Sequence, residues 1–119
     1  MQKLIFFLHG YNDSPANHKK TMEWLQTKLH NACIIMPQAP EICDKNPKQW
    51  QWFGMLQPDP ENKRINPQTS VAQIFAIYQK AAPNIDFCAK QINSFIDDIQ
   101  NKYDIDDKHT YIVGFSQGA

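Results

Sequence analysis

The segment YIVGFSQGA, residues 111–119, decides the fold. An apolar run enters the pattern GxSxG, formed by Gly114, Ser116 and Gly118, in which a strand turns sharply into a helix and presents a serine above the sheet. Side chains at the two glycine positions would clash in such a turn. The pattern therefore predicts a nucleophile elbow with Ser116 as the candidate nucleophile. A plain Gly-Ser turn remains an alternative, and a phosphate-binding loop is less favoured because GFSQGA lacks GxGxxG and the lysine of GxxxxGK.

Two further apolar runs upstream of this segment predict strands. Leu4 to Leu8 is unbroken and passes directly into the loop HGYNDSP, as expected of a strand buried on both faces. Cys33 to Met36 is a short run that contains two isoleucines and is closed by Pro37. Thr110 to Val113 forms a third strand, which leads into the elbow.

In the segments between these strands, apolar residues recur at the spacing of a helix. The first helix is predicted to start at the serine-proline pair after the first loop, where serine caps the helix and proline takes its first position. The other two are separated by Pro83, and Asn84 is expected to cap the last and longest. The predicted helices span residues 15–31, 70–82 and 84–103.

The long segment 37–67 shows no sustained periodicity and carries most of the eight prolines of the chain. We therefore predict a long loop, a kind of segment that is usually functional or mobile. Trp50 and Trp52 in this loop either cover the core or line a binding pocket.

Strands that alternate with helices predict an α/β fold, with a parallel sheet, right-handed crossovers and helices on both faces. A length of 119 residues fits one domain. Because the carboxyl ends of parallel strands meet at one edge, the loop HGYNDSP and the elbow should face each other. Backbone amides there could stabilise the negative charge of a tetrahedral intermediate. One such donor is the amide of Gln117, and the second should come from the loop after the first strand.

Composition argues against several classes of protein. Lysine plus arginine and aspartate plus glutamate both number 12, so no net charge favours nucleic-acid binding. Three widely spaced cysteines without CxxC fit neither a disulfide framework nor a zinc site, and a cytoplasmic location is expected. Cys33 and Cys88 should lie in the core and Cys43 in an exposed loop.

No stretch suits a signal peptide or the roughly 18 residues of a membrane span. The aspartates between residues 97 and 107 lack metal-ligand spacing and predict a solvated surface.

Three stretches in order resemble the bacterial phospholipase/carboxylesterase family, the acyl-protein-thioesterase-like α/β-hydrolases. They are LHGYNDS at 8–14, PQAPEICDKNPKQWQWF at 37–53 and GFSQGA at 114–119. The resemblance implies that residues 1–119 are the N-terminal portion of a single α/β-hydrolase domain, truncated after the nucleophile strand.

The resemblance also implies roles for individual residues. Ser116 corresponds to the catalytic nucleophile, and the amides of Tyr11 and Gln117 correspond to the oxyanion hole. Trp52 and Phe53 belong to the QWF stretch, which resembles the loop that shapes the acyl pocket and so implies substrate binding. The sequence departs from the family pattern at Asn12, where the family usually has glycine, and over residues 65–82.

A serine nucleophile also needs a histidine base and a carboxylate that orients it. In α/β-hydrolases these follow the serine in the order Asp, His, so both are expected beyond residue 119. His109 should lie at the opposite end of the third strand, about 20 Å from Ser116 at 3.3 Å per residue, and His30 should also lie on the far side of the sheet. His9 is expected to support the oxyanion loop, and His18 to be solvated.

The favoured hypothesis is a serine hydrolase that cleaves carboxylic esters or thioesters of small acyl substrates through an acyl-enzyme on Ser116, without a cofactor or metal. The alternative is an inactive truncated fragment or subunit that associates with a partner chain. We expect the 119-residue chain alone to be inactive and to self-associate through the unpaired apolar edge of its sheet.

Overall fold

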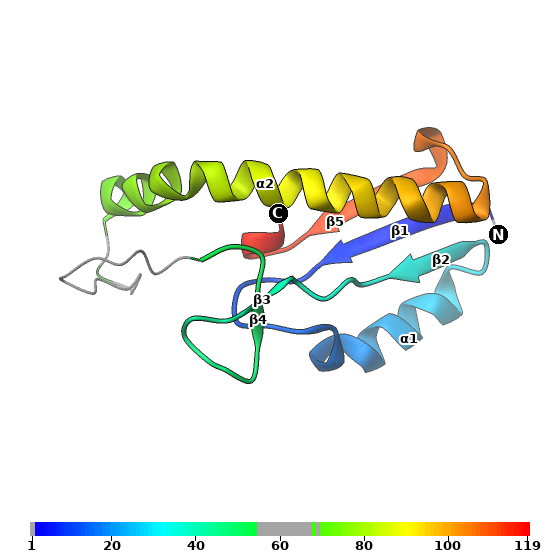
Figure 1. The fold of residues 1–119 in the computed structure, drawn as a ribbon. Coiled ribbons are helices and arrows are strands. Elements are labelled where there is room, and N and C mark those ends of the chain that lie inside the picture. Colours follow the sequence, from blue (N-terminus) through cyan, green and yellow to red (C-terminus); the bar gives the residue numbers. More distant parts are fainter. Residues whose placement is uncertain (1, 55–67, 69) are drawn as a thin grey trace.

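The computed structural model describes residues 2–54, 68 and 70–119. Its centre is a parallel sheet in the order β2-β1-β5 (Figure 1). The strands are β1 (Lys3–Leu8), β2 (Ala32–Ile35) and β5 (Thr110–Gly114). Each lies within one residue of its predicted bounds at either end, and the predicted α/β class with a parallel sheet is confirmed.

The central strand β1 is the most buried part of the sheet. Leu4 pairs with Cys33 on one side and with Thr110 on the other. Leu4 and Phe6 are fully buried on one face, whereas Ile5 and Phe7 on the opposite face are half-buried. The sequence predicts that the strand is buried on both faces. Burial is complete on the face of Leu4 and Phe6 and partial on the face of Ile5 and Phe7.

The crossover from β1 to β2 and the crossover from β2 to β5 run in opposite directions across the sheet. Because right-handed crossovers in opposite directions place their helices on opposite faces of a sheet, α1 (Lys19–Lys28) and α2 (Val71–Tyr103) lie on either side of it (Figure 1). A 3₁₀ turn, η1 (Pro15–His18), precedes α1 (Lys19–Lys28). The prediction of one helix from residue 15 to 31 is thus wrong at both ends. The expected cap, Ser14, makes no capping bond with its side chain, and the carboxylate of Asp13 accepts bonds from the Ser14 amide and the Asn17 side chain instead.

The prediction of two helices separated at Pro83 is also wrong, because α2 (Val71–Tyr103) runs through this proline. A reciprocal capping box between Ser70 and Gln73 starts the helix. Proline inside a helix costs about 3 kcal/mol. Burial of Ala81 before Pro83 and of Cys88 after it, with Ile85 and Ile92 packed against the same cluster, stabilises the helix against this cost.

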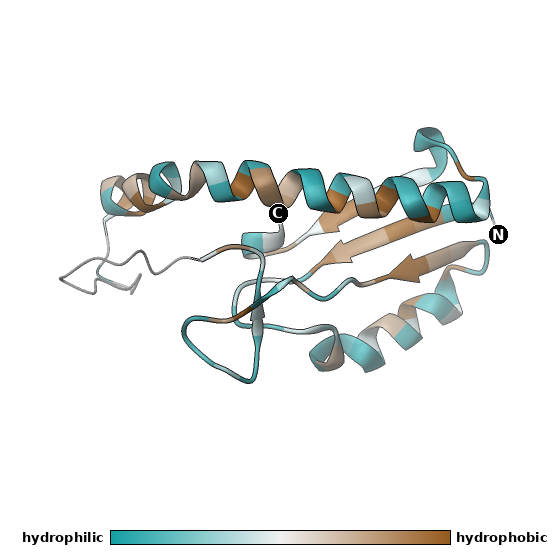
Figure 2. Cartoon of the chain, viewed as in Figure 1, coloured by the Kyte–Doolittle hydropathy of each residue, from teal (hydrophilic) through white to brown (hydrophobic). Residues whose placement is uncertain are grey.

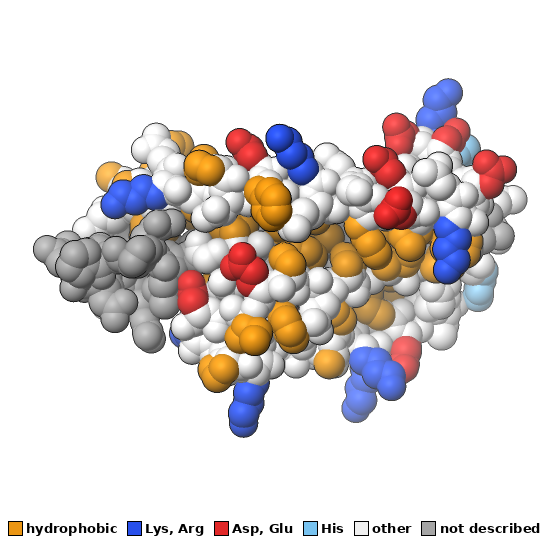
Figure 3. All heavy atoms as spheres, viewed as in Figure 1, with side chains coloured by type: hydrophobic (Ala, Val, Ile, Leu, Met, Phe, Trp, Pro, Cys, Tyr) orange, Lys and Arg blue, Asp and Glu red, His pale blue; other side chains and the backbone are white. Residues whose placement is uncertain are grey.

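Apolar side chains fill the space between α2 and the sheet. Figure 2 shows the strands as largely hydrophobic, and Figure 3 shows a band of hydrophobic side chains beneath α2 between charged groups of both signs. One cluster of Leu4, Phe6 and Ile96 lies under the C-terminal half of α2, where the rings of Phe6 and Phe95 meet edge to face. A second cluster lies at the carboxyl end of β1 and includes Leu8, Ala39, Trp52, Phe53, Ala81 and Cys88.

A small antiparallel hairpin lies within the predicted long loop. It is formed by β3 (Glu41–Ile42) and β4 (Trp50–Gln51). Cys43 within it is buried, with 4% of its surface exposed, so its prediction as an exposed thiol is wrong. The hairpin turns Cys43 inward, and its amide donates to the carbonyl of Gln49. The rest of the predicted loop, residues 55–67, lies outside the described residues.

In the described part of the chain, no helix is long and apolar enough to cross a membrane. Within the same residues, no group of three histidine, cysteine, aspartate or glutamate side chains is arranged to hold a metal ion.

Candidate active site

Ser116 stands on the turn that follows β5 and opens the short 3₁₀ helix η3 (Ser116–Gly118). Its φ of 54° lies in the left-handed region, which costs a residue with a side chain about 1–2 kcal/mol. The turn is held by hydrogen bonds from the Gly118 amide to the Phe115 carbonyl at 3.0 Å and from the Phe115 amide to the Leu8 carbonyl at 3.1 Å. The serine is exposed, and its hydroxyl makes no hydrogen bond within the described residues.

The two flanking glycines allow this turn to form. A Cβ atom at Gly114 would lie 2.3 Å from the carbonyl oxygen of Gly118. One at Gly118 would lie 2.3 Å from the carbonyl oxygen of Leu8 and 2.5 Å from that of His9. Real Cβ atoms essentially never approach backbone atoms so closely, so the predicted clash is confirmed.

The loop after β1 lies against the serine, as the sequence predicts. A Cβ atom built on Gly10 would be 3.4 Å from the Cβ of Ser116. Tyr11 is the next residue in the sequence after this contact. Among the described residues, no hydrogen bond uses the amide of Tyr11 or of Gln117. The structure thus brings the candidate nucleophile and the segments of both candidate oxyanion donors together.

The β3-β4 hairpin fixes the path of this loop. The Asn12 amide donates to the Trp50 carbonyl, and the Trp50 amide donates to the Asp13 carbonyl, both at 3.0 Å. Asn12 has a φ of 58°, so asparagine takes the left-handed conformation at the position where glycine is usual in the resembled family. The departure from the family pattern is therefore compatible with the loop.

The side chain of Tyr11 ties the same loop to the hairpin, because its hydroxyl donates a hydrogen bond to the Asp44 carboxylate. Burial, and then this hydrogen bond, raise the pKa of Tyr11 well above its ordinary value. The phenol therefore stays protonated and remains a donor to Asp44.

His9 supports the loop from beneath. With 2% of its surface exposed, it donates from Nδ1 to the Gly10 carbonyl at 2.8 Å and accepts at Nε2 from the Ala39 amide at 3.0 Å. These partners assign the neutral tautomer with the proton on Nδ1. Its ring also packs on the indole of Trp52, with centroids 5.1 Å apart. Both ring nitrogens are occupied, so His9 supports the loop, as predicted, and is not placed to take a proton from Ser116.

None of the other three histidines makes a hydrogen bond to the serine hydroxyl within the described residues. His18 is predicted to be solvated, but the structure gives it a partner. Its Nε2 lies 2.7 Å from the Asp13 carboxylate. Burial alone would raise the pKa of Asp13, but hydrogen bonds from His18, Asn17 and the Ser14 amide lower it. His109 pairs with Asp106 just before β5, at the opposite end of that strand from Ser116. His30 precedes Asn31, whose carbonyl binds the amide of Lys3 at the start of β1.

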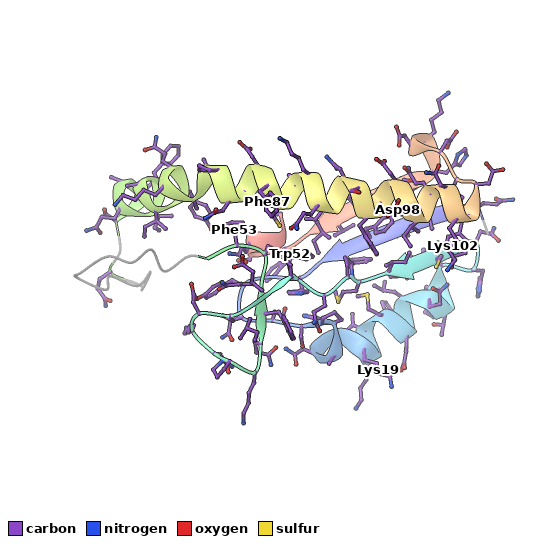
Figure 4. The ribbon with its side chains drawn as sticks, in the orientation of Figure 1. Lys19, Trp52, Phe53, Phe87, Asp98 and Lys102 are labelled. Atoms are coloured by element: carbon purple, nitrogen blue, oxygen red, sulfur yellow. The ribbon has the colours of Figure 1, made fainter. Side chains whose placement is uncertain are left out.

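Trp52 and Phe53 lie beneath α2, beside the helical turn that carries the serine (Figure 4). Only 5% and 6% of their surfaces are exposed, and both belong to the core cluster. Trp52 also forms one wall of an apolar cavity of about 400 Å³ that reaches Pro40, Ile92 and Phe95. Trp52 therefore combines the two interpretations of the loop tryptophans, whereas Phe53 is placed in the core.

Two buried glutamine side chains were not singled out in the sequence. Gln51 accepts from the Asp44 amide and donates to Glu41, both at 3.0 Å. The side chain of Gln117 bonds to the backbone of Trp52 and Phe53. For Gln51 the sequence carries one signal, a polar residue between two tryptophans; for the side chain of Gln117 it carries none.

Two comparisons with known proteins agree with this geometry. A family model described as phospholipase/carboxylesterase matches residues 1–119. Among solved structures, the crystal structure of esterase PE8 is similar over 98% of this chain, with a TM-score of 0.67 and 22% sequence identity. The chain covers 47% of that esterase chain, or about half its length. The structural likeness shows the α/β-hydrolase fold, and, because the family model matches throughout, the chain belongs to the phospholipase/carboxylesterase family.

Proposed function

We propose that this chain carries the nucleophile and the oxyanion hole of a serine hydrolase that cleaves carboxylic esters or thioesters. The observation that carries the proposal is the conformation of Ser116. An exposed serine is held in the left-handed region between two glycines that tolerate no side chain, directly against the loop after β1. Such strain is costly and concentrates at functional sites.

In the proposed reaction, the hydroxyl oxygen of Ser116 attacks the carbonyl carbon of the substrate and forms a tetrahedral intermediate. The amides of Tyr11 and Gln117 donate hydrogen bonds to its oxyanion, and one such donor is worth about 3 kcal/mol of transition-state stabilisation. The bond to the leaving alcohol or thiol then breaks, and an acyl-enzyme remains. Water releases the acid and restores the serine. This chemistry requires no cofactor.

The base that takes the serine proton, and the carboxylate that orients it, are proposed to lie beyond residue 119. The structure supports this placement because the histidines nearest the loop have other partners. His9 uses both ring nitrogens for the backbone, and His18 is paired with Asp13.

The substrate is proposed to be a small acyl ester or thioester in the cytoplasm. The apolar cavity beside Trp52 and the balanced charge of the chain suit an uncharged acyl group better than a polyanion. Trp52 is the better candidate for contact with the acyl group, since Phe53 does not line this cavity.

Labelling of the full-length protein with a fluorophosphonate probe tests the proposal. We expect Ser116→Ala to abolish both labelling and ester hydrolysis, because the probe reacts with an activated serine. Ser94→Ala, which removes an exposed serine on α2, serves as the matched control and should leave both unchanged. Labelling that survives Ser116→Ala would refute the assignment. Labelling of the 119-residue chain by itself would refute the placement of the base beyond residue 119.

A further inference from the structure

We propose that the side chain of Gln117, separately from its backbone amide, is a positioning residue that couples the two halves of the oxyanion hole. The proposal rests on the proposed function, since it concerns the geometry of the same site. It starts from a glutamine that is 7% exposed and whose side-chain oxygen and nitrogen each make a hydrogen bond to the backbone. The Oε1 atom accepts from the Trp52 amide at 2.9 Å, and the Nε2 atom donates to the Phe53 carbonyl at 2.8 Å.

These two bonds join segments that are far apart in the sequence. They connect the elbow to residues 64 and 65 positions earlier in the chain. The partners are one backbone donor and one backbone acceptor, both buried, which normally find a partner inside the protein. A side-chain amide satisfies both at once without carrying a charge, because it holds a donor and an acceptor side by side.

The connection continues from Trp52 to the other side of the site. The indole Nε1 of Trp52 donates to the His9 carbonyl at 2.6 Å, and its ring packs on that of His9. His9 in turn donates from Nδ1 to the carbonyl of Gly10, the residue before Tyr11. A single buried chain of contacts therefore runs from Gln117 through Trp52 and His9 to the loop of Tyr11.

The two candidate oxyanion donors are the amides at the ends of this chain, Gln117 and Tyr11. An oxyanion hole depends on donors already held in place before the reaction, and small displacements cost large factors in rate. Every variant at position 117 other than proline keeps the backbone amide. Loss of the side-chain bonds therefore changes the position of the donor without removing it.

The test compares two variants of the full-length protein. Gln117→Met keeps the length of the side chain and removes both hydrogen bonds. We expect kcat for a short activated ester to fall at least about 10-fold, and KM to change less than about 3-fold, because the interaction lost acts in the transition state. Fluorophosphonate labelling of Ser116 should slow in parallel.

Gln100→Met is the matched control. Gln100 is also a buried glutamine with two side-chain bonds, to Asp107 and Thr110, and these lie at the other end of β5. It should lower the thermal midpoint of unfolding without changing kcat. An equal loss of kcat in both variants, or an unchanged kcat in Gln117→Met, would overturn the proposal.

A second readout does not depend on activity. The ¹⁵N-resolved signal of the Trp52 indole NH should shift, and its hydrogen exchange should accelerate, in Gln117→Met but not in Gln100→Met. An unchanged indole signal would overturn the coupling even if kcat fell. Activity retained in Ser116→Ala would instead refute the proposed function, and the indole signal would still decide whether Gln117 positions the loop.

Discussion

At the scale of single residues, the site depends on backbone conformations that most residues avoid. Ser116 and Asn12 both have positive φ, at 54° and 58°. Such conformations persist only where the surrounding contacts determine them. For Ser116 the contact is the close approach of Gly118 to the end of β1, which leaves no room for a methyl group.

We therefore expect Gly118→Ala to destabilise the full-length protein by about 3 kcal/mol, at the upper end of the cost of overpacking. The added Cβ would lie 2.3 Å from a backbone oxygen that cannot move without distorting β1. The free energy of unfolding from urea denaturation measures the effect. Gly54→Ala is the control, since its Cβ would have no neighbour closer than 3.8 Å among the described residues and should change stability by less than about 0.5 kcal/mol. A loss no larger than that of the control would contradict the close approach.

At the scale of elements, α2 has two parts that differ in how many of their side chains are buried. Its C-terminal part buries Cys88, Ile96 and Gln100, whereas residues 71–82 bury only Ala81 and extend past the ends of the strands (Figure 1). Pro83 lacks the N–H that would bind the carbonyl of Gln79. Helical continuity there depends on packing around the proline.

Amide hydrogen exchange should resolve these two parts. We expect residues 72–82 to show protection factors at least about tenfold lower than residues 88–100, because local opening follows the number of buried contacts. Pro83→Ala restores the missing donor and should raise the protection of residues 72–82 while leaving that of residues 88–100 unchanged. Uniform protection along α2 in the unmodified protein would show that the proline and the missing contacts do not weaken its first half.

At the scale of the whole molecule, the sheet formed by the described residues has an open edge at β5. Tyr111, Ile112 and Val113 on this strand are 44–54% exposed, and Phe115 after it is 74% exposed. Unpaired backbone groups combined with exposed apolar side chains favour pairing with another chain.

The 119-residue chain alone is therefore expected to self-associate. Light scattering after size-exclusion chromatography should give a mass above that of the monomer, increasing with concentration. Ile112→Lys places a charge on the edge and should shift the chain toward the monomer. Ile42→Lys introduces the same charge at an equally exposed isoleucine of the hairpin and should have no such effect. A monomer at all concentrations would contradict the expectation.

The sequence by itself determined the elements around the site and their order. The run from Leu4 to Leu8, the run at Cys33 and the segment YIVGFSQGA each carry local signals, namely apolar continuity and glycines that a sharp turn requires. The loops that follow β1 and β5 could be predicted to meet because parallel strands align their carboxyl ends.

Only the tertiary structure decided the features that depend on distant segments. The side chain of Gln117 finds its partners 64 and 65 residues away, Cys43 is buried by a hairpin, and α2 continues through Pro83 because both sides of the proline are packed. Local patterns record the conformational preference of a few neighbouring residues. The free energy that decides these features comes from contacts made only when the whole chain is folded.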